Sequence, residues 1–92
     1  MSYEVRHTAA FKRDYKLAIR RHLPVENLHA VVEKLKNGVT LPPSNRDHAL
    51  SGRWANHREC HVAPDWLLIY QIHGDVLVLE LTRTGSHSDL FG

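Results

Sequence analysis

The sequence predicts an α+β fold in which a short strand and a helical hairpin precede an antiparallel sheet of three to four strands. Three observations predict it. Two stretches of the first half carry apolar residues at helical spacing, the second half changes to strand-like runs, and tight turns separate those runs. The chain has 92 residues, so we expect residues 1–92 to form a single domain.

The first half predicts a strand followed by a helix. Residues 3–7 alternate Tyr and Val with charged residues, which is typical of a short strand. Thr8 provides an N-cap for a helix. The apolar residues of that helix share one face at i, i+4, i+7 and i+8, namely Phe11, Tyr15, Ala18 and Ile19. Its cations occupy the remaining surface, namely Lys12, Arg13, Lys16 and Arg20.

A second helix is predicted over residues 25–36. Pro24 ends the first helix, because proline disfavours helical backbone in the residue before it. Leu28, Val31, Val32 and Leu35 then repeat the helical spacing, and Gly38 is a natural C-terminal stop. The short connection favours an antiparallel hairpin. Residues 41–45 form a proline-rich loop by composition.

The second half predicts three strands, over residues 58–62, 66–73 and 76–83. The turns between them, at residues 63–65 and 74–75, are too short for anything but antiparallel neighbours. The last two strands contain nearly continuous apolar runs, so we expect both faces of the sheet to be covered. The helical hairpin covers one face, and the other needs a partner or a functional crevice. Residues 86–92 are expected to make a final turn or strand end.

Charge and cysteine content limit the class of protein. Residues 1–45 carry eight Lys/Arg against four acids, and residues 46–92 carry four against six, which gives the net charge of +2. A single cysteine, Cys60, excludes an internal disulfide. No apolar run approaches the roughly 18 residues that span a bilayer, and the N-terminus lacks a signal-peptide stretch. We therefore expect a cytoplasmic protein with no membrane association.

Histidine is enriched, with eight residues in the chain and five of them after residue 45. Imidazole titrates near neutral pH and can pass protons there. Four ionisable residues stand at the edges of the predicted elements, namely His48, His61, Asp65 and His87. We expect them to converge at one end of the sheet, with His48 in a loop and His87 in the tail.

Metal and thiol chemistry fit the sequence poorly. His57 and His61 flank Glu59 and Cys60, but on a strand the two histidines would lie about 13 Å apart. We therefore expect no metal site and no cofactor. Cys60 and His61 point to opposite faces of a strand, so Cys60 is interpreted as a buried core thiol.

Acid–base chemistry on a phosphodiester fits better. RNA cleavage requires a base for the 2′-OH proton, an acid for the departing 5′-oxygen and a cation for the phosphate, which His and Asp side chains with Arg83 can supply. Phe91 offers a face for stacking of a base. Each residue also has a structural interpretation: His48 as a loop residue, His61 as a hydrogen-bonded strand residue, Asp65 as a turn former and Phe91 as a core anchor.

Three stretches of the chain together resemble the YafQ branch of the RelE/ParE superfamily of bacterial type II toxins. The motifs that carry the resemblance are D-H-x-L-x-G-x-W from Asp47, C-H-x-x-P-D-W from Cys60 and R-T-G-S-H-S-x-L-F from Arg83. Residues 11–16 and Leu41-Pro42 also resemble the family, so the likeness covers almost the whole chain.

The resemblance implies a RelE-like microbial RNase-type fold and a ribosome-dependent mRNA endonuclease. Such a toxin cuts translated message in the ribosomal A site without a metal and is held inactive by a DinJ-like antitoxin. Operator DNA would be bound only through the toxin–antitoxin complex. The family's functional residues match His48, His61, Asp65, His87 and Phe91. We assign His87 as the general acid, His48 with Asp65 to the base side, and His61 to substrate orientation or phosphate stabilisation.

Two other functions remain open from the sequence. A ParE-like toxin would share the fold but act on DNA gyrase and cleave nothing. A non-catalytic RNA-binding module would use the basic helix and leave the histidines as solvated surface groups. We expect the basic helix to contact ribosomal RNA phosphates if the nuclease interpretation holds.

Overall fold

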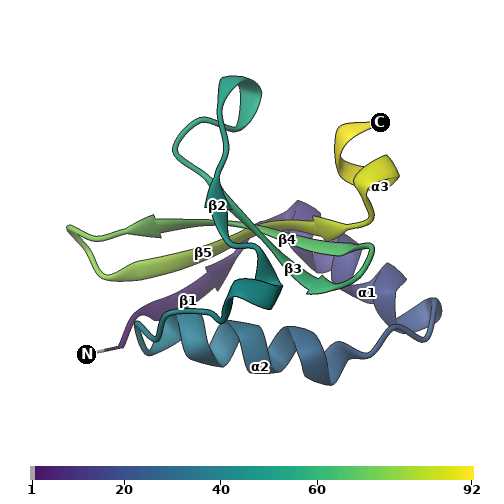
Figure 1. Ribbon diagram of the computed structural model, residues 1–92, viewed down its shortest axis with the longest axis horizontal. Helices are drawn as coiled ribbons and strands as arrows, with labels where there is room; N and C mark the ends of the chain where they lie inside the picture. The colour runs from purple at the N-terminus through teal and green to yellow at the C-terminus, as the bar shows by residue number, and fades with distance from the viewer. Residues whose placement is uncertain (1) are drawn as a thin grey trace.

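A five-stranded mixed sheet organises the chain, with the strands in the order β1-β5-β4-β3-β2. The computed structural model describes residues 2–92. The elements in chain order are β1 (Glu4–His7), α1 (Ala9–Arg20), α2 (Val25–Lys36), the 3₁₀ helix η1 (Pro43–Asn45), β2 (His48–Ala49), the 3₁₀ helix η2 (Gly52–Trp54), β3 (Arg58–Ala63), β4 (Trp66–His73), β5 (Val78–Gly85) and α3 (His87–Phe91). Figure 1 shows α1 and α2 on one side of the sheet, and α3 and the β2–β3 connection on the other.

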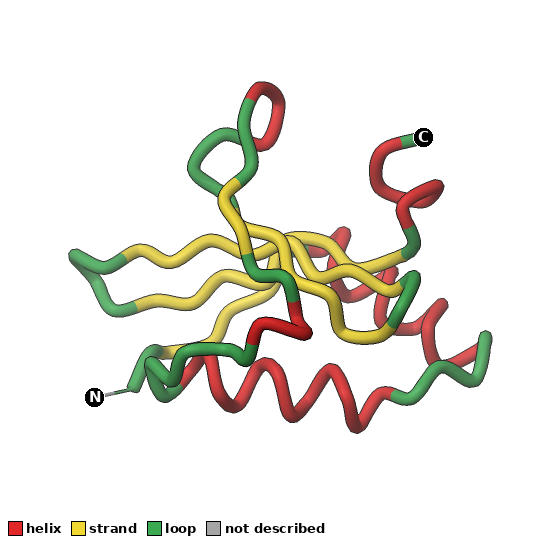
Figure 2. Tube along the Cα trace, in the orientation of Figure 1, coloured by secondary structure: helices red, strands yellow, loops and turns green. Residues whose placement is uncertain are grey.

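The two long helices confirm the predicted pattern. The Thr8 side chain accepts a hydrogen bond from the backbone N–H of Phe11 at 2.9 Å, which caps α1. The predicted bounds of α2 agree with the structure, and Gly38 follows its end with a positive φ of 70°. Figure 2 shows the two helices joined by a short loop beneath the strands.

The predicted order of a strand, a helical hairpin and then three to four antiparallel strands is confirmed, and the first strand joins the same sheet through a parallel pair. β1 pairs in parallel with β5, whereas the other pairs are antiparallel. The two-residue strand β2 contains His48, which the sequence placed in a loop. Two residues are too few to produce a detectable alternation, so the pattern missed this strand.

The last strand and the tail also differ from prediction. β5 begins at Val78 rather than Val76, because the connection from β4 is longer than Gly74-Asp75 and includes Leu77 at a φ of 54°. The tail forms the helix α3 rather than a turn or strand end. Ser86 accepts from the backbone N–H of Asp89 while Asp89 accepts from that of Ser86, a capping box that starts the helix.

Two hydrophobic clusters share strand β4. Leu68 and Tyr70 face α1 and α2, whereas Leu67 and Ile69 face the opposite side. That second side is covered by Leu90 of α3 together with Leu50 and Trp54 of the β2–β3 connection. The expectation of two covered faces is confirmed, and the second face is the one that carries the histidines. Among the described residues, no helix is long and apolar enough to span a bilayer.

Candidate active site

Glu59 and His61 lie on the face of β3 that points away from α1 and α2. Glu59 pairs with Ile69 and His61 with Leu67, the two residues of the second cluster, whereas Cys60 points to the helix side. Glu59 is only 4% exposed. Its Oε1 lies 3.9 Å from Nε2 of His61 and 3.6 Å from Nε2 of His48, so two imidazoles surround a buried carboxylate.

His48 reaches Glu59 from the neighbouring strand β2, where the two residues are paired in register. Its Nδ1 lies 2.7 Å from the carbonyl oxygen of Arg46. A carbonyl only accepts, so Nδ1 carries the proton and Nε2 is the nitrogen that faces the carboxylate. Glu59 was not among the residues that the sequence singled out for chemistry. The available signal was its position two residues before His61, which places both side chains on one face of a strand.

His87 enters the same group from the start of α3. The Nδ1 of His87 lies 3.2 Å from Oδ1 of Asp65, and its backbone N–H donates to the same oxygen at 3.3 Å. These two hydrogen bonds lower the pKa of Asp65 below its ordinary value. The sequence grouped Asp65 with His48, whereas in the structure Asp65 lies beside His87 and Glu59 is the carboxylate nearest to His48.

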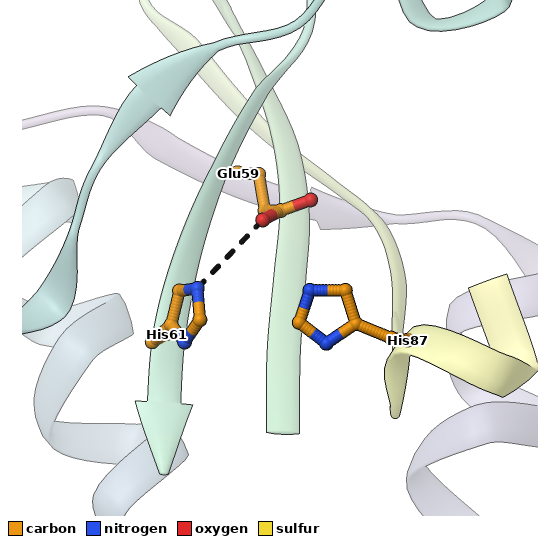
Figure 3. A group of neighbouring side chains, drawn as sticks. All are labelled: Glu59, His61 and His87. Carbon is orange, nitrogen blue, oxygen red and sulfur yellow. Dashed lines mark ion pairs between the residues drawn. The ribbon is translucent and has the colours of Figure 1, made fainter. Parts of the chain in front are cut away.

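Three of these side chains form one compact group. The nearest nitrogen or oxygen atoms of Glu59, His61 and His87 all lie within 4.8 Å of one another. The rings of His61 and His87 are 5.9 Å apart at a 60° angle. Figure 3 shows a nitrogen of each ring directed toward the Glu59 carboxylate. Residues separated by up to 28 positions in the chain therefore meet on one face of the sheet.

Several contacts fix α3, and with it His87. Arg21 donates to Asp89 at 3.0 Å and ties α3 to the end of α1. The backbone N–H of Ser86 and the Arg21 guanidinium lower the pKa of Asp89. Gly85 leaves room for the turn into α3, because a Cβ at this position would lie 2.9 Å from Cβ of Asp89.

Phe91 lies beside His87 at the end of α3. The two ring centroids are 6.2 Å apart, and Phe91 is 46% exposed. Leu90, rather than Phe91, anchors the tail in the core. The exposed phenyl face next to the imidazole is available to a ligand.

Arg83 makes its ion pair within the chain. It donates to Asp14 of α1 at 2.6 and 3.1 Å, which raises the pKa of the guanidinium. Another arginine shares a hollow with one of the histidines. Arg46 and His61 line the same surface hollow of about 400 Å³, beside η1. The sequence motif contained Arg46, but nothing in its spacing distinguished it from the other arginines.

The cations of α1 are exposed and belong to the other side of the sheet. They are Lys12, Arg13, Lys16 and Arg20, and α1 packs on β5 from the face opposite to His61. A hollow of about 460 Å³ also lies on that side, between α1 and α2. It shares no residue with the histidine group, so the two are separate features of the surface.

Cys60 is a core thiol, as predicted. It is fully buried on the helix side, and burial raises its pKa to about 12. A thiol in this state is protonated at neutral pH and is no nucleophile. His57 contacts the carbonyl of Ala55 and does not join His61.

Comparison with known proteins gives a consistent result over the whole chain. Residues 3–92 match the family described as the bacterial toxin of type II toxin–antitoxin system, YafQ. The mRNA interferase toxin YafQ of Escherichia coli K12 is 38% identical over 90 residues, 97% of this chain and 96% of that protein. The crystal structure of the E. coli DinJ–YafQ toxin–antitoxin complex matches at a TM-score of 0.90 and 35% identity, over 100% of both chains. A metal-bound toxin from Helicobacter pylori matches at a TM-score of 0.91 and 37% identity, over 99% of this chain and 100% of that one.

Proposed function

The chain belongs to the YafQ family of bacterial type II toxins, and from this membership we propose that it cuts translated messenger RNA in the ribosomal A site by acid–base catalysis. It is the toxin of a toxin–antitoxin system and an endoribonuclease that cleaves mRNA. The dependence on the ribosome, the site residues and their roles are our proposal.

The observation that carries the mechanism is the meeting of Glu59, His61 and His87 within 4.8 Å, with Nε2 of His48 3.6 Å from Oε1 of Glu59. Cleavage of RNA by its own 2′-oxygen needs one group to remove the 2′-OH proton and another to protonate the leaving 5′-oxygen. Imidazoles held on one surface by separate carboxylates can divide these two tasks.

We assign the acid role to His87. Asp65 accepts from Nδ1 and thereby directs Nε2 toward the group, where it can donate its proton to the 5′-oxygen as the phosphorus–oxygen bond breaks. The exposed position of His87 at the start of α3 allows the leaving nucleotide to reach it. Phe91, beside His87, stacks on a base of the message.

We assign the base side to His48 with Glu59. The 2′-oxygen loses its proton to this pair and attacks phosphorus, which gives a 2′,3′-cyclic phosphate and a free 5′-hydroxyl. His61, whose ring lies 5.9 Å from that of His87, donates to a non-bridging phosphate oxygen. Arg46, across the hollow that it shares with His61, supplies the cationic contact to the phosphate. Arg83 is the second candidate for that contact, and it would have to exchange Asp14 for the phosphate.

The partners follow from the same proposal. A DinJ-like antitoxin holds the toxin inactive, and the complex rather than the toxin alone binds operator DNA. The relative's complex with DinJ supports an antitoxin partner. Because the proposed substrate is messenger RNA under translation, we expect the protein to act in the cytoplasm. The exposed cations of α1, on the opposite side from the histidines, contact ribosomal RNA while the site faces the message.

The test is to induce the protein in cells and to map message ends by primer extension, for the wild type and for His87→Ala. We expect in-frame cuts within translated codons, reduced about 10²- to 10⁴-fold in the variant, because a general acid contributes that much. His73→Ala is the matched control, since His73 pairs with Glu80 at 2.9 Å outside the site. Cleavage equal in His87→Ala and wild type would overturn the mechanism. Toxicity without any message cuts would favour a gyrase-directed toxin or an RNA-binding module.

A further inference from the structure

We propose that Asp47 is a positioning residue for the base: it accepts hydrogen bonds from Tyr70 and Arg58 on one face of the sheet and thereby fixes His48 on the other face. The inference rests on the proposed function, because it takes His48 as part of the pair that removes the 2′-OH proton. It goes beyond that function by explaining how a strand of two residues holds this imidazole in place.

The strand that carries His48 is weakly held by its own backbone. In β2, His48 and Ala49 are the two residues that pair with β3. Arg46, just before it, has a left-handed backbone with a φ of 49°, which is unfavourable for a residue other than glycine. The ring of His48 bonds the carbonyl of Arg46, which belongs to the same short segment and moves with it. The position of His48 therefore depends on a contact outside the β2 ladder.

Asp47 makes such a contact through its carboxylate. The hydroxyl of Tyr70 donates to Oδ1 at 2.5 Å, and the Arg58 guanidinium donates from Nη2 to Oδ2 at 3.2 Å and from Nε to Oδ1 at 3.4 Å. Tyr70 is 1% exposed and lies opposite Arg58 in the β3–β4 register, so Asp47 is bound to the centre of the sheet. Burial, followed by the contact with Asp47, raises the pKa of Tyr70, so its hydroxyl stays protonated and remains a donor at neutral pH.

Asp47 and His48 are consecutive, and they make their contacts on opposite faces of the sheet. Tyr70 belongs to the core cluster under α1 and α2, whereas Glu59, the carboxylate beside His48, pairs with Ile69 of the second cluster. Alternate residues of an extended chain point to opposite faces, so a shift by one residue would turn His48 away from Glu59. The contact of Asp47 on the helix side therefore sets the face on which His48 appears.

The hydroxyl of Tyr70 is the important part of this anchor. The side chain of Arg58 is 41% exposed, and exposed ion pairs contribute little to stability. The Tyr70 hydroxyl is different, because a buried donor that loses its acceptor is left with an uncompensated cost of desolvation. Tyr70→Phe removes this bond with the least change of shape, and Asp47→Ala removes the whole anchor.

The first test measures single-turnover cleavage on ribosomes that carry a message. We expect the maximal rate to fall by about 100-fold in Asp47→Ala, as for a misplaced reacting group, while the ribosome concentration that gives half the maximal rate stays unchanged. The loss should be smaller in Tyr70→Phe, where Arg58 still holds the carboxylate, and in Asp47→Asn, where the amide oxygen can still accept from Tyr70. Circular dichroism checks the fold, and Tyr70→Phe keeps the test valid if Asp47→Ala does not fold.

The matched control is Tyr15→Phe. It removes another tyrosine hydroxyl from a hydrogen bond, the one with His29 at 2.8 Å between α1 and α2. This pair lies on the helix side and touches no residue of the histidine group, so we expect cleavage at the wild-type rate. A loss as large as in Tyr70→Phe would overturn the proposal, because it would show that any lost hydroxyl bond slows cleavage.

A double-mutant cycle separates positioning from a general loss of stability. If Asp47 acts through His48, Asp47→Ala lowers the rate of the wild type but lowers that of His48→Ala no further. Equal factors in the two backgrounds would overturn the proposal, because Asp47 would then act independently of His48.

A spectroscopic arm needs no RNA. The proton–carbon NMR signal of the His48 ring is assigned by its disappearance in His48→Ala, and we expect it to shift in Asp47→Ala and in Tyr70→Phe. The ring signal of His73, which pairs with Glu80 elsewhere on the sheet, should stay in place. Wild-type cleavage by His48→Ala would refute the base role in the proposed function. Normal cleavage together with an unmoved His48 signal in Asp47→Ala would refute the positioning role alone.

Discussion

One oxygen of the Asp65 carboxylate, Oδ1, accepts two hydrogen bonds from His87, one from the backbone N–H at 3.3 Å and one from the ring Nδ1 at 3.2 Å. Asp65 belongs to the turn between β3 and β4, whereas His87 begins α3, so a single side chain joins two segments that are 22 residues apart. The backbone contact fixes the start of the helix, and the ring contact fixes the orientation of the imidazole. Asp65 is therefore a positioning residue for His87.

Asp65→Ala is expected to reduce message cleavage by about 100-fold without unfolding the protein. The side chain is 72% exposed, so its loss costs the fold little, but a misplaced acid costs about that factor in rate. Asp65→Asn should restore part of the activity, because its amide oxygen can still accept from Nδ1. The measurement is the single-turnover cleavage rate on ribosomes, with Asp75→Ala in the exposed β4–β5 turn as the control. Equal rates for Asp65→Ala and Asp65→Asn would contradict a role in orienting the ring.

Gly85→Ala is expected to displace α3 and to lower cleavage while the sheet stays folded. The added Cβ would lie 2.9 Å from Cβ of Asp89 and 3.1 Å from its Oδ2, closer than van der Waals contact permits. The helix that carries His87 must then shift. The matched control is Gly74→Ala, where an added Cβ meets nothing within 4 Å. Cleavage rates with circular dichroism test this prediction, and normal cleavage in Gly85→Ala would show that the position of α3 is not critical.

Acid is expected to release α3 before the sheet unfolds. The Ser86 N–H and the Arg21 guanidinium lower the pKa of Asp89 in the folded protein. A carboxyl whose pKa is lowered on folding stabilises the folded state above its unfolded value of about 3.9, and this contribution disappears as the pH falls through the lower folded value. NMR signals of Leu90 should therefore change below about pH 4 while those of Leu68 do not. In Asp89→Asn this separate transition should be absent, and its persistence would assign the effect to another group.

Local patterns predicted the helices well because their signals are local. The N-cap at Thr8, the helical spacing of α2 and the stop at Gly38 all act within a few residues. The same reasoning placed Cys60 and His61 on opposite faces of a strand. The capping box at Ser86 was also local, but a five-residue helix is too short to show an apolar stripe.

The composition of the site depends on contacts that no local pattern contains. Glu59 meets His48 through the register of β2 and β3, and His87 arrives from a segment after β5. The sequence assigned Arg83 to phosphate binding because its ion pair with Asp14, 69 residues earlier in the chain, cannot be seen in a local pattern.

Asp14→Ala is expected to destabilise the fold by about 2 kcal/mol, because it leaves the Arg83 guanidinium and the Thr84 N–H without their acceptor. For a domain of this size, Tm should fall by roughly 10 °C. The control is Arg6→Ala, which removes an exposed surface pair with Glu4 and should leave Tm unchanged. Thermal unfolding followed by circular dichroism gives both values. An unchanged Tm in Asp14→Ala would mean that Arg83 is free to bind phosphate.

The cations of α1 are expected to make the association with the ribosome steeply dependent on salt. Each phosphate that they neutralise releases counterions, so replacing Lys12, Arg13, Lys16 and Arg20 by Gln should weaken binding and reduce the salt slope by about one for each cation–phosphate pair that is removed. The chemistry lies on the other face of the sheet, so the histidine group should remain intact in this variant. Binding of catalytically inactive His87→Ala toxin to ribosomes, measured across a range of salt concentrations with and without the α1 replacements, tests the prediction. Lys34→Gln on α2 is the control, and a salt slope that the α1 replacements leave unchanged would place the ribosome-binding surface elsewhere on the protein.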